Sequence, residues 1–239
     1  MTTADPPQPE IVRLPGAPEV AEALATRLLS SLTERQANSG VVQLALTGGR
    51  IATRAYERLA ADGPASSVDW SRVELWWGDE RFVAAADDDR NAKQALDLLT
   101  AALPLDSGRV HPMPASDAGL GLDAAVAAYA AELGATSFDI CLLGMGPDGH
   151  VASLFPGHPS SSATGDVIAV RDSPKPPPDR ISLTLPVINR SAEVWFVVAG
   201  ADKADATQLA LAGGPVPAGG ARGRLRTLWL LDDAAAGSA

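Results

Sequence analysis

A three-layer α/β/α sandwich with a mostly parallel, Rossmann-like sheet is the fold class that this 239-residue sequence predicts. Three observations support the prediction. Short apolar runs alternate with longer amphipathic segments, which is the pattern of strand–helix–strand units. Several of these runs lack the polar alternation of a half-exposed strand, as expected when both faces of a sheet are covered. Glycines or charged residues follow the runs directly, where such sheets place their ligands.

The first forty residues illustrate the pattern. Residues 1–9 are rich in proline and polar residues and are expected to form a flexible tail, so a single domain should span 10–239. An edge strand is expected at 10–14. Residues 17–36 carry apolar side chains at helical spacing and predict an amphipathic helix. The sequence Asn-Ser-Gly at 38–40 should end it.

The remaining elements continue the alternation. Further strands are expected at 41–46, 73–77, 110–113, 138–143, 167–170, 181–185, 193–199 and 224–231. Helices are expected at 51–61, 91–102, 121–133, 150–154 and 200–212, the last with Asp202 as a cap. Residues 213–223 predict a loop, and residues 232–239 a tail of small residues.

Composition excludes several classes of function. The formal net charge of −10 makes nucleic acids and anionic membranes poor partners, so an anionic ligand would need a local basic pocket. Cys141 is the only cysteine, which rules out a disulfide within the chain and fits a reducing compartment. The first residues lack the features of a signal peptide, and no apolar run approaches membrane-spanning length. A cytoplasmic location is therefore expected.

The stretch 138–157, FDICLLGMGPDGHVASLFPG, is the most informative part of the chain. Its apolar run ends in three glycines: Gly144, Gly146 and Gly149. Such a loop lets the backbone approach a ligand closely, and Asp148 and His150 lie within it. A tight turn with a solvated Asp and His is the alternative interpretation, and the loop alone leaves both open.

The glycine spacing also matches the dinucleotide fingerprint G-x-G-x-x-G, but the chemistry does not. Pro147 has no N–H to offer a pyrophosphate, and Asp148 would place a negative charge beside it. A dinucleotide cofactor is therefore not expected.

A second glycine turn, Thr47-Gly48-Gly49-Arg50, lies between the strand expected at 41–46 and the helix expected at 51–61. A strand, a glycine turn and a helix together present free N–H groups and the positive end of the helix dipole to an anion. A simple turn is the alternative, but the flanking elements favour a phosphate-binding turn.

Charged residues also lie beside three other expected strands. Asp79 and Arg81 follow the strand at 73–77, and Arg180 comes after the proline-rich sequence SPKPPP at 173–178. Lys203 lies in the first turn of a helix, where the dipole disfavours a cation, so an anion nearby would explain its position.

The sequence GMGPDGHVASLFPG resembles the signature of the 6-phosphogluconolactonases, within the superfamily that includes glucosamine-6-phosphate deaminase. Four other blocks resemble family motifs and occur in the family's order. They are LALTGGR (44–50), WWGDERFV (76–83), RISLTLPVIN (180–189) and VVAGADKADA (197–206). Five ordered blocks are far more specific than any one of them.

The resemblance implies the same fold and the hydrolysis of 6-phospho-glucono-1,5-lactone. No cofactor is expected. His150 would be the base, and Asp148 would either orient it or bind substrate hydroxyls. The backbone N–H groups of 144–150 would stabilise the oxyanion. Substrate and phosphate contacts would come from Thr47, Gly48, Gly49, Arg50, Asp79, Arg81, Gly144, Gly146, Arg180 and Lys203.

Two departures from the family pattern concern arginines. Arg50 stands where the family more often has a small hydroxyl residue, so its contact with phosphate is left open. Arg90 stands where a Ser is common. The three histidines, His111, His150 and His158, lack the spacing of metal ligands, so no metal site is expected.

Two rival functions remain. In the amino-sugar phosphate deaminase branch, an Asn-Glu-Pro element follows the D-G-H turn, but here Phe155 stands at the position of its Glu. The other rival is a non-catalytic sugar-phosphate sensor, which would carry a DNA-binding domain. The length before residue 40 and the acidic charge disfavour it. A small-molecule partner, and a monomer or weak homodimer, are expected.

Overall fold

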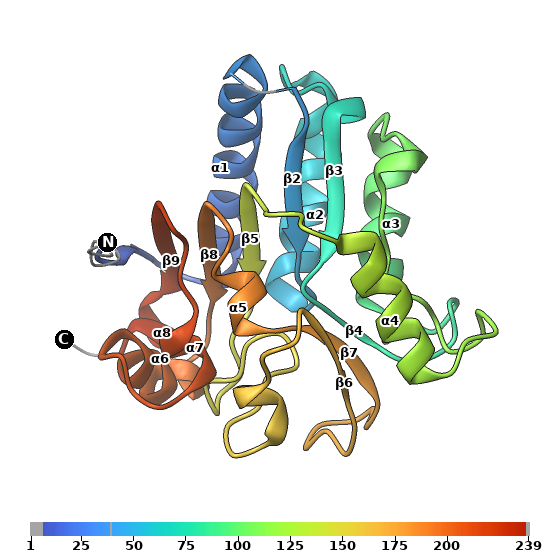
Figure 1. Ribbon diagram of the computed structural model, residues 1–239. Helices are drawn as coiled ribbons and strands as arrows, with labels where there is room; N and C mark the ends of the chain where they lie inside the picture. The colour runs from blue at the N-terminus through green and yellow to red at the C-terminus, as the bar shows by residue number, and fades with distance from the viewer. Residues whose placement is uncertain (1–6, 39, 238–239) are drawn as a thin grey trace, which may run out of the picture.

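The computed structural model describes residues 7–38 and 40–237, and the predicted α/β/α sandwich is confirmed (Figure 1). Six strands form one parallel sheet in the order β1-β9-β8-β5-β2-β3. Their bounds are β1 Glu10–Leu14, β2 Val42–Leu46, β3 Val73–Trp77, β5 Ile140–Leu143, β8 Glu193–Val198 and β9 Arg226–Asp232. As expected, β1 lies at an edge.

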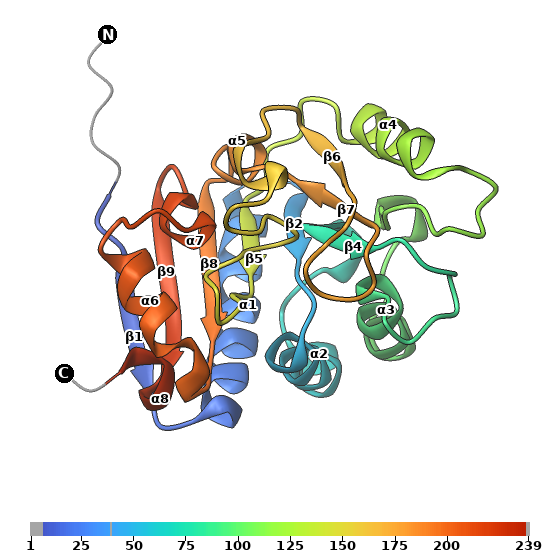
Figure 2. The ribbon, with the colours of Figure 1, turned by 90° about the horizontal axis from the view of Figure 1, so that it is seen from below.

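Helices cover both faces of this sheet because its buried strands present apolar side chains alternately to either side. Leu142 and Trp195 pack with α1 (Ala17–Asn38), α2 (Arg50–Asp62) and α3 (Asn91–Ala102). Cys141 and Phe196 face the opposite core, which contains α4 (Leu122–Leu133) and α6 (Ala204–Leu211). Short helices complete this second layer: α5 Leu185–Ile188, α7 Pro217–Gly220 and α8 Asp233–Ala236. Figure 2 shows the two layers on either side of the strands.

A second, three-stranded sheet was not predicted. The strands β4 (Asp79–Arg81), β7 (Arg180–Leu183) and β6 (Val167–Val170) pair antiparallel, with β7 in the middle. This small sheet lies beside α4 (Figure 2). The charged residues that were expected to follow β3 thus form the strand β4. Its pairing with β7 places Arg81 directly opposite Arg180.

Two predicted elements are wrong. Residues 110–113 do not form a strand, because only Val110 pairs with Leu75, and the prolines that flank Met113 interrupt further pairing. Residues 150–154 do not form a helix. Ala152 adopts a left-handed conformation with φ of 48°, and Val151 and Leu154 form an isolated bridge across this turn.

The C-terminal third differs in detail from the prediction. A 3-10 turn at Ala201–Lys203 precedes α6, and Asp202 pairs with Lys203 instead of capping the helix. The expected loop at 213–223 contains α7, and the expected tail contains α8. Residues 1–6 of the predicted N-terminal tail, Ser39 of the predicted helix stop and residues 238–239 lie outside the described residues. No described helix is long and apolar enough to cross a membrane.

Candidate active site

The candidate site lies at the carboxyl ends of β2, β5 and β8. The chain runs from β2 to β3 on one side of the sheet and from β5 to β8 and β9 on the other, so β2 and β5 flank a topological switch point. Parallel sheets bind ligands in the crevice at such a point. A cavity of about 320 Å³ occupies it here.

Most of the predicted site residues line this one cavity. They are Thr47, Gly48, Gly49, Arg50, Asp79, Arg81, Gly144, Gly146, His150, Arg180 and Lys203. Asp148, the remaining predicted residue, lies behind His150 and contacts its ring. The sequence therefore identified a set of residues that the fold brings together from five separate segments.

The turn after β2 has the geometry of an anion-binding turn. Gly49 has φ of 103°, a conformation that favours glycine, and α2 begins at the next residue. The buried hydroxyl of Tyr56 accepts a hydrogen bond from N–H of Thr47 (3.2 Å) and donates one to its carbonyl (2.7 Å). The first turn of α2 thus points its N–H groups, which have no acceptor within the helix, at the cavity from a fixed position.

The loop after β5 places His150 against Asp148, with Nδ1 of the ring 2.5 Å from Oδ1 of the carboxylate. Gly146 permits this arrangement, because a Cβ at that position would lie 2.0 Å from the His150 ring. When Nδ1–H donates to Asp148, Nε2 is left as the acceptor. No group among the described residues is hydrogen-bonded to Nε2, and His150 lines the cavity.

Burial and the neighbouring charges keep this pair in the state that a general base requires. Burial lowers the pKa of His150, and the hydrogen bond and charge of Asp148 oppose that fall. Burial acts to raise the pKa of Asp148, but the hydrogen bond from His150 and the charges of His150 and Lys175 hold it below its usual value. At neutral pH the ring is therefore neutral and the carboxylate ionised.

Lys175, which was not predicted as a site residue, reaches this pair from the proline-rich segment. Its Nζ lies 3.3 Å from Nδ1 of His150 and 3.5 Å from Oδ1 of Asp148. Arg180 Nη2 holds the segment in place by donating to the carbonyls of Lys175 (3.0 Å) and Pro176 (2.9 Å). The only feature of the sequence that could have indicated Lys175 as a site residue is its place among the prolines of 173–178. A stiff segment of this kind can fix the position of a charged side chain.

Two arginines lie side by side on the small sheet. Arg81 and Arg180 are direct cross-strand partners on β4 and β7, an arrangement in which like charges repel. Burial lowers the pKa of Arg180, and the charge of Arg81 adds to this effect. The guanidinium of Arg180 also lies 5.7 Å from the centre of the Phe155 ring. An anion in the cavity would relieve the repulsion.

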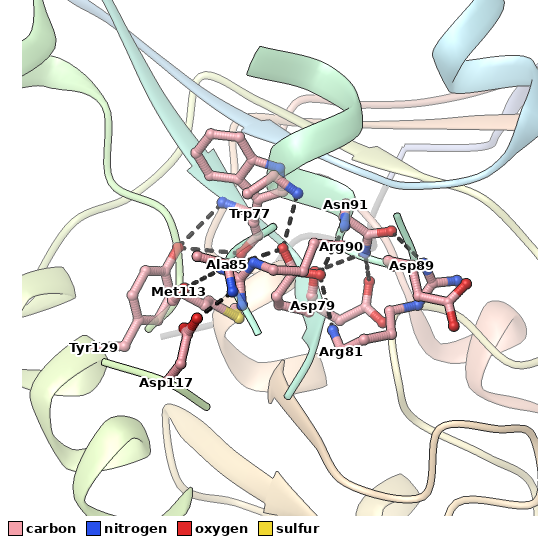
Figure 3. Close-up of polar contacts among 12 residues, drawn as sticks. Trp77, Asp79, Arg81, Ala85, Asp89, Arg90, Asn91, Met113, Asp117 and Tyr129 are labelled. Carbon is pink, nitrogen blue, oxygen red and sulfur yellow. Dashed lines mark hydrogen bonds and ion pairs between the residues drawn. The ribbon is translucent and has the colours of Figure 1, made fainter. Parts of the chain in front are cut away.

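Asn91, also missed by the sequence analysis, is hydrogen-bonded to Arg81 (Figure 3) and packs against the glycine turn. Its Oδ1 accepts a hydrogen bond from Nη1 of Arg81 (2.8 Å), and its Nδ2 donates to the carbonyl of Asp79 (3.0 Å). The same oxygen would lie 1.9 Å from a Cβ at position 48, so only glycine fits there. Asp79 is buried and accepts a hydrogen bond from Ser153 (2.6 Å).

The other predicted features are placed as follows. Lys203 Nζ lies 2.6 Å from the carboxylate of Asp202. Asp202 is therefore the nearby anion that was expected to explain the position of Lys203 at the start of a helix. The N–H groups of Gly144, Gly146 and Gly149 donate to Thr47 Oγ1 and to the carbonyls of His150 and Gly146, so these three are not available for an oxyanion. No group of three or more His, Cys, Asp or Glu within the described residues could hold a metal ion.

A larger depression of about 650 Å³ lies at the opposite, amino-terminal ends of β5, β8 and β9. Arg35 pairs there with Asp139 (3.3 Å) and Glu193, and Arg226 pairs with Glu10 and Glu193. Four of its lining residues, Arg35, Asp139, Glu193 and Arg226, therefore pair with one another, and the site residues predicted from the sequence lie at the other end of the sheet.

Comparison with known proteins decides the family. The family model described as glucosamine-6-phosphate isomerases/6-phosphogluconolactonase matches residues 15–229. This chain belongs to that family. Its resemblance to the 6-phosphogluconolactonases, inferred above from five motifs, is thereby confirmed.

Members of the family closely resemble this chain in sequence and structure. A 6-phosphogluconolactonase of Streptomyces coelicolor is 51% identical, covering 91% of this chain and 89% of that protein. One of Mycobacterium tuberculosis is 47% identical, covering 93% and 95%. The crystal structure of a 6-phosphogluconolactonase from Thermotoga maritima superposes with a TM-score of 0.85 at 28% identity, covering 95% of this chain and all of the other.

Proposed function

We propose that this protein hydrolyses 6-phospho-D-glucono-1,5-lactone to 6-phospho-D-gluconate, a step of the oxidative pentose phosphate pathway, with His150 activating the attacking water. The protein is an enzyme, a carboxylic ester hydrolase that acts on a sugar-phosphate lactone. Relatives of that name at 47–51% identity support the reaction. The observation that carries the mechanism is the Asp148–His150 pair, which leaves Nε2 as an acceptor at the cavity.

The chemical steps follow from the positions of these groups. Nε2 of His150 takes a proton from water as the water oxygen bonds to the lactone carbonyl carbon. Nζ of Lys175, 3.3 Å from Nδ1 of His150, would offset the charge that develops on the carbonyl oxygen. The bond from that carbon to the ring oxygen then breaks, and His150 returns the proton to the ring oxygen. Asp148 holds the ring in the required tautomer throughout.

The part of the cavity around the N-terminus of α2 and Arg81 suits the phosphate. The N-terminus of α2 supplies N–H groups, and Arg81, Arg180 and Lys203 supply positive charge. The Nε of Arg81 is buried and has no hydrogen-bond partner among the described residues. Arg50 lines the same cavity and adds a further cation to this side. These contacts would place the lactone carbon near His150.

The structure around Phe155 favours lactone hydrolysis over deamination. Deamination of an amino-sugar phosphate requires ring opening and proton transfer between adjacent carbons, and so a second acid or base. Phe155, at the position of the deaminase Glu, is buried, with its ring centre 4.7 Å from that of His150. Its aromatic ring packs against His150 and Arg180 and has no proton to transfer.

A lactonase assay on enzymatically generated 6-phosphogluconolactone, corrected for spontaneous hydrolysis, tests the proposal. Changing His150→Asn should lower kcat roughly 10²–10⁴-fold without changing the thermal midpoint much. His111→Asn is the matched control, because His111 bridges Glu74 and Glu132 and does not line the cavity. Near-normal turnover in a folded His150→Asn variant would exclude His150 as the base.

The same preparation separates the rival functions. We expect no ammonia release from glucosamine 6-phosphate, and ammonia production at a rate matching lactone hydrolysis would favour the deaminase. A sensor would bind the sugar phosphate without turnover. A small-molecule partner, a monomer or weak homodimer and a cytoplasmic location remain predictions from the sequence, and size-exclusion chromatography with light scattering checks the assembly state.

A further inference from the structure

Two buried charged residues lie next to the phosphate side of the cavity without lining it. Glu80 has no exposed surface and Arg90 is only 4% exposed. Glu80 belongs to β4 and Arg90 directly precedes α3, so they lie at the two ends of the connection between these elements. A buried ion pair is weak evidence for stability alone, because desolvation of the two charges offsets their attraction. The contacts of Glu80 indicate what this pair does.

One carboxylate holds the two ends of that loop together. Oε1 of Glu80 accepts hydrogen bonds from the N–H groups of Arg81 and Asn91, both at 2.8 Å. Oε2 accepts one from N–H of Ala92, also at 2.8 Å. The second and third of these donors belong to the first turn of α3, which has no intrahelical acceptor for them.

We propose that Glu80, with Arg90 as its buried counter-ion, is a positioning residue that sets Arg81 and Asn91 in the arrangement that receives the substrate phosphate. The inference rests on the proposed function, because it assumes that Arg81 contacts the phosphate. Glu80 fixes the backbone of both residues, and their side chains then meet in the hydrogen bond between Nη1 of Arg81 and Oδ1 of Asn91 (Figure 3).

The same contacts reach the glycine turn. Asn91 fits against Gly48 so closely that a Cβ there would lie 1.9 Å from Oδ1. A shift of the α3 N-terminus would therefore move Asn91 away from Arg81 and at the same time disturb the packing of Asn91 against Gly48. Loss of Glu80 should act on the phosphate contacts as a set and leave the lactone end of the site, 144–150, intact.

Arg90 is the buried counter-ion that favours the ionised form of Glu80. Its Nη2 lies 3.7 Å from Oε2 of Glu80 and donates to the carbonyl of Met113 at 2.6 Å. Burial raises the pKa of Glu80, and the charge of Arg90 with the three backbone N–H groups opposes that rise. An ionised carboxylate can accept the hydrogen bonds from Arg81, Asn91 and Ala92 at both of its oxygens, whereas a protonated one must donate from one of them.

A double-mutant cycle tests the inference. Glu80→Gln, Arg81→Gln and the double variant are assayed on 6-phosphogluconolactone and on unphosphorylated glucono-1,5-lactone. Because a charge-assisted contact is weakened, Glu80→Gln should raise KM for the phosphorylated substrate about tenfold. Its kcat, and its KM for the unphosphorylated lactone, should stay within about twofold. In the Arg81→Gln background, Glu80→Gln should raise the KM for the phosphorylated lactone by less than about a further twofold.

Each outcome is decisive. Equal losses on both substrates, or full additivity with Arg81→Gln, would overturn the positioning role and leave a structural one. If Arg81→Gln raises KM equally for both lactones, the assignment of Arg81 to the phosphate is refuted, and the present inference is refuted with it. Selectivity of Arg81→Gln without any effect of Glu80→Gln refutes only the present inference. Glu57→Gln, an exposed change on α2, is the control for charge.

A second variant covers the case in which Glu80→Gln does not fold. Arg90→Gln removes the counter-ion and should raise KM for the phosphorylated lactone in the same selective way, whereas Arg90→Lys, which keeps the charge, should recover at least part of the loss. An Arg90→Gln variant that folds and has unchanged KM for both substrates would overturn the proposal. Circular dichroism and the thermal midpoint establish that each variant is folded.

Discussion

Replacing Asp148 by Asn should weaken the base and move the acid limb of the pH profile in a defined direction. In the wild type, burial lowers the pKa of His150, and the hydrogen bond and charge of Asp148 oppose that fall. Removing the carboxylate removes the opposing effect, so the pKa of His150 falls further below its usual value of about 6.5. The midpoint of the acid limb should therefore move to lower pH.

The size of the effect on turnover follows from the contact. A charge-assisted hydrogen bond at 2.5 Å between Nδ1 and Oδ1 would contribute about 1.5–3 kcal/mol when buried. The Asp148 side chain is 37% exposed, so solvent screening reduces this contribution to about 1–2 kcal/mol. We expect kcat at pH 7.5 to fall about 5–30-fold. Orientation of the ring, which Asp148 also provides, would add to this loss.

The assay measures kcat/KM on 6-phosphogluconolactone between pH 4.5 and 7.5, with the spontaneous rate subtracted at every pH. Lys175→Met provides the opposite perturbation, because the charge of Lys175 lowers the pKa of His150. Its acid limb should move to higher pH. Asp97→Asn, which removes an exposed carboxylate from α3, should leave the limb in place. An unchanged limb in Asp148→Asn, or shifts of the same sign in both site variants, would refute this assignment of the base.

Other perturbations test other parts of the site. Neutralising Arg81, Arg180 or Lys203 should weaken binding of the phosphorylated lactone by about 1.5–3 kcal/mol and barely affect the unphosphorylated one, and equal KM changes on both would contradict a phosphate role. Tyr56→Phe leaves the buried N–H and carbonyl of Thr47 unpaired and should lower the free energy of unfolding in urea by about 1–3 kcal/mol. Gly49→Ala, at φ of 103° in open space, should lower the free energy of unfolding by about 1–3 kcal/mol because of backbone strain. Gly146→Ala should abolish turnover, because the added Cβ would displace the His150 ring. A normal kcat in Gly146→Ala would show that the loop adapts. Chelators should not change the rate, and a loss with EDTA that a divalent ion restores would contradict that expectation.

The sequence was sufficient to predict the parallel sheet and the residues at its carboxyl edge. Each buried strand is an apolar run that ends in glycine or charged residues, and parallel strands bring those ends to one edge whatever their order. For this reason the glycine turn at 47–50 and the loop at 144–150 could be assigned to one site, although 97 residues separate Thr47 from Gly144.

The parts that could not be predicted depend on contacts between distant segments. Asp79–Arg81 is only three residues long and entirely charged, so neither periodicity nor strand propensity indicates β4, which forms because β7 supplies its partner. Asn91 begins a helix and gives no sign that it contacts Arg81. The helix predicted at 150–154 is replaced by a turn with Ala152 in a left-handed conformation, which tertiary contacts impose against local preference.

Under the proposed function, an acidic protein has to select an anion. With a net charge of −10, the protein as a whole repels a sugar phosphate, so attraction must be local. The fold achieves this by pairing Arg81 with Arg180 across two strands, an arrangement unfavourable without a ligand. Asn91 holds the guanidinium group of Arg81, and Phe155 and the carbonyls of 175–177 hold that of Arg180. Because these contacts fix the cations before any ligand arrives, binding of a phosphate there, as proposed above, would relieve a repulsion already present and require little further ordering.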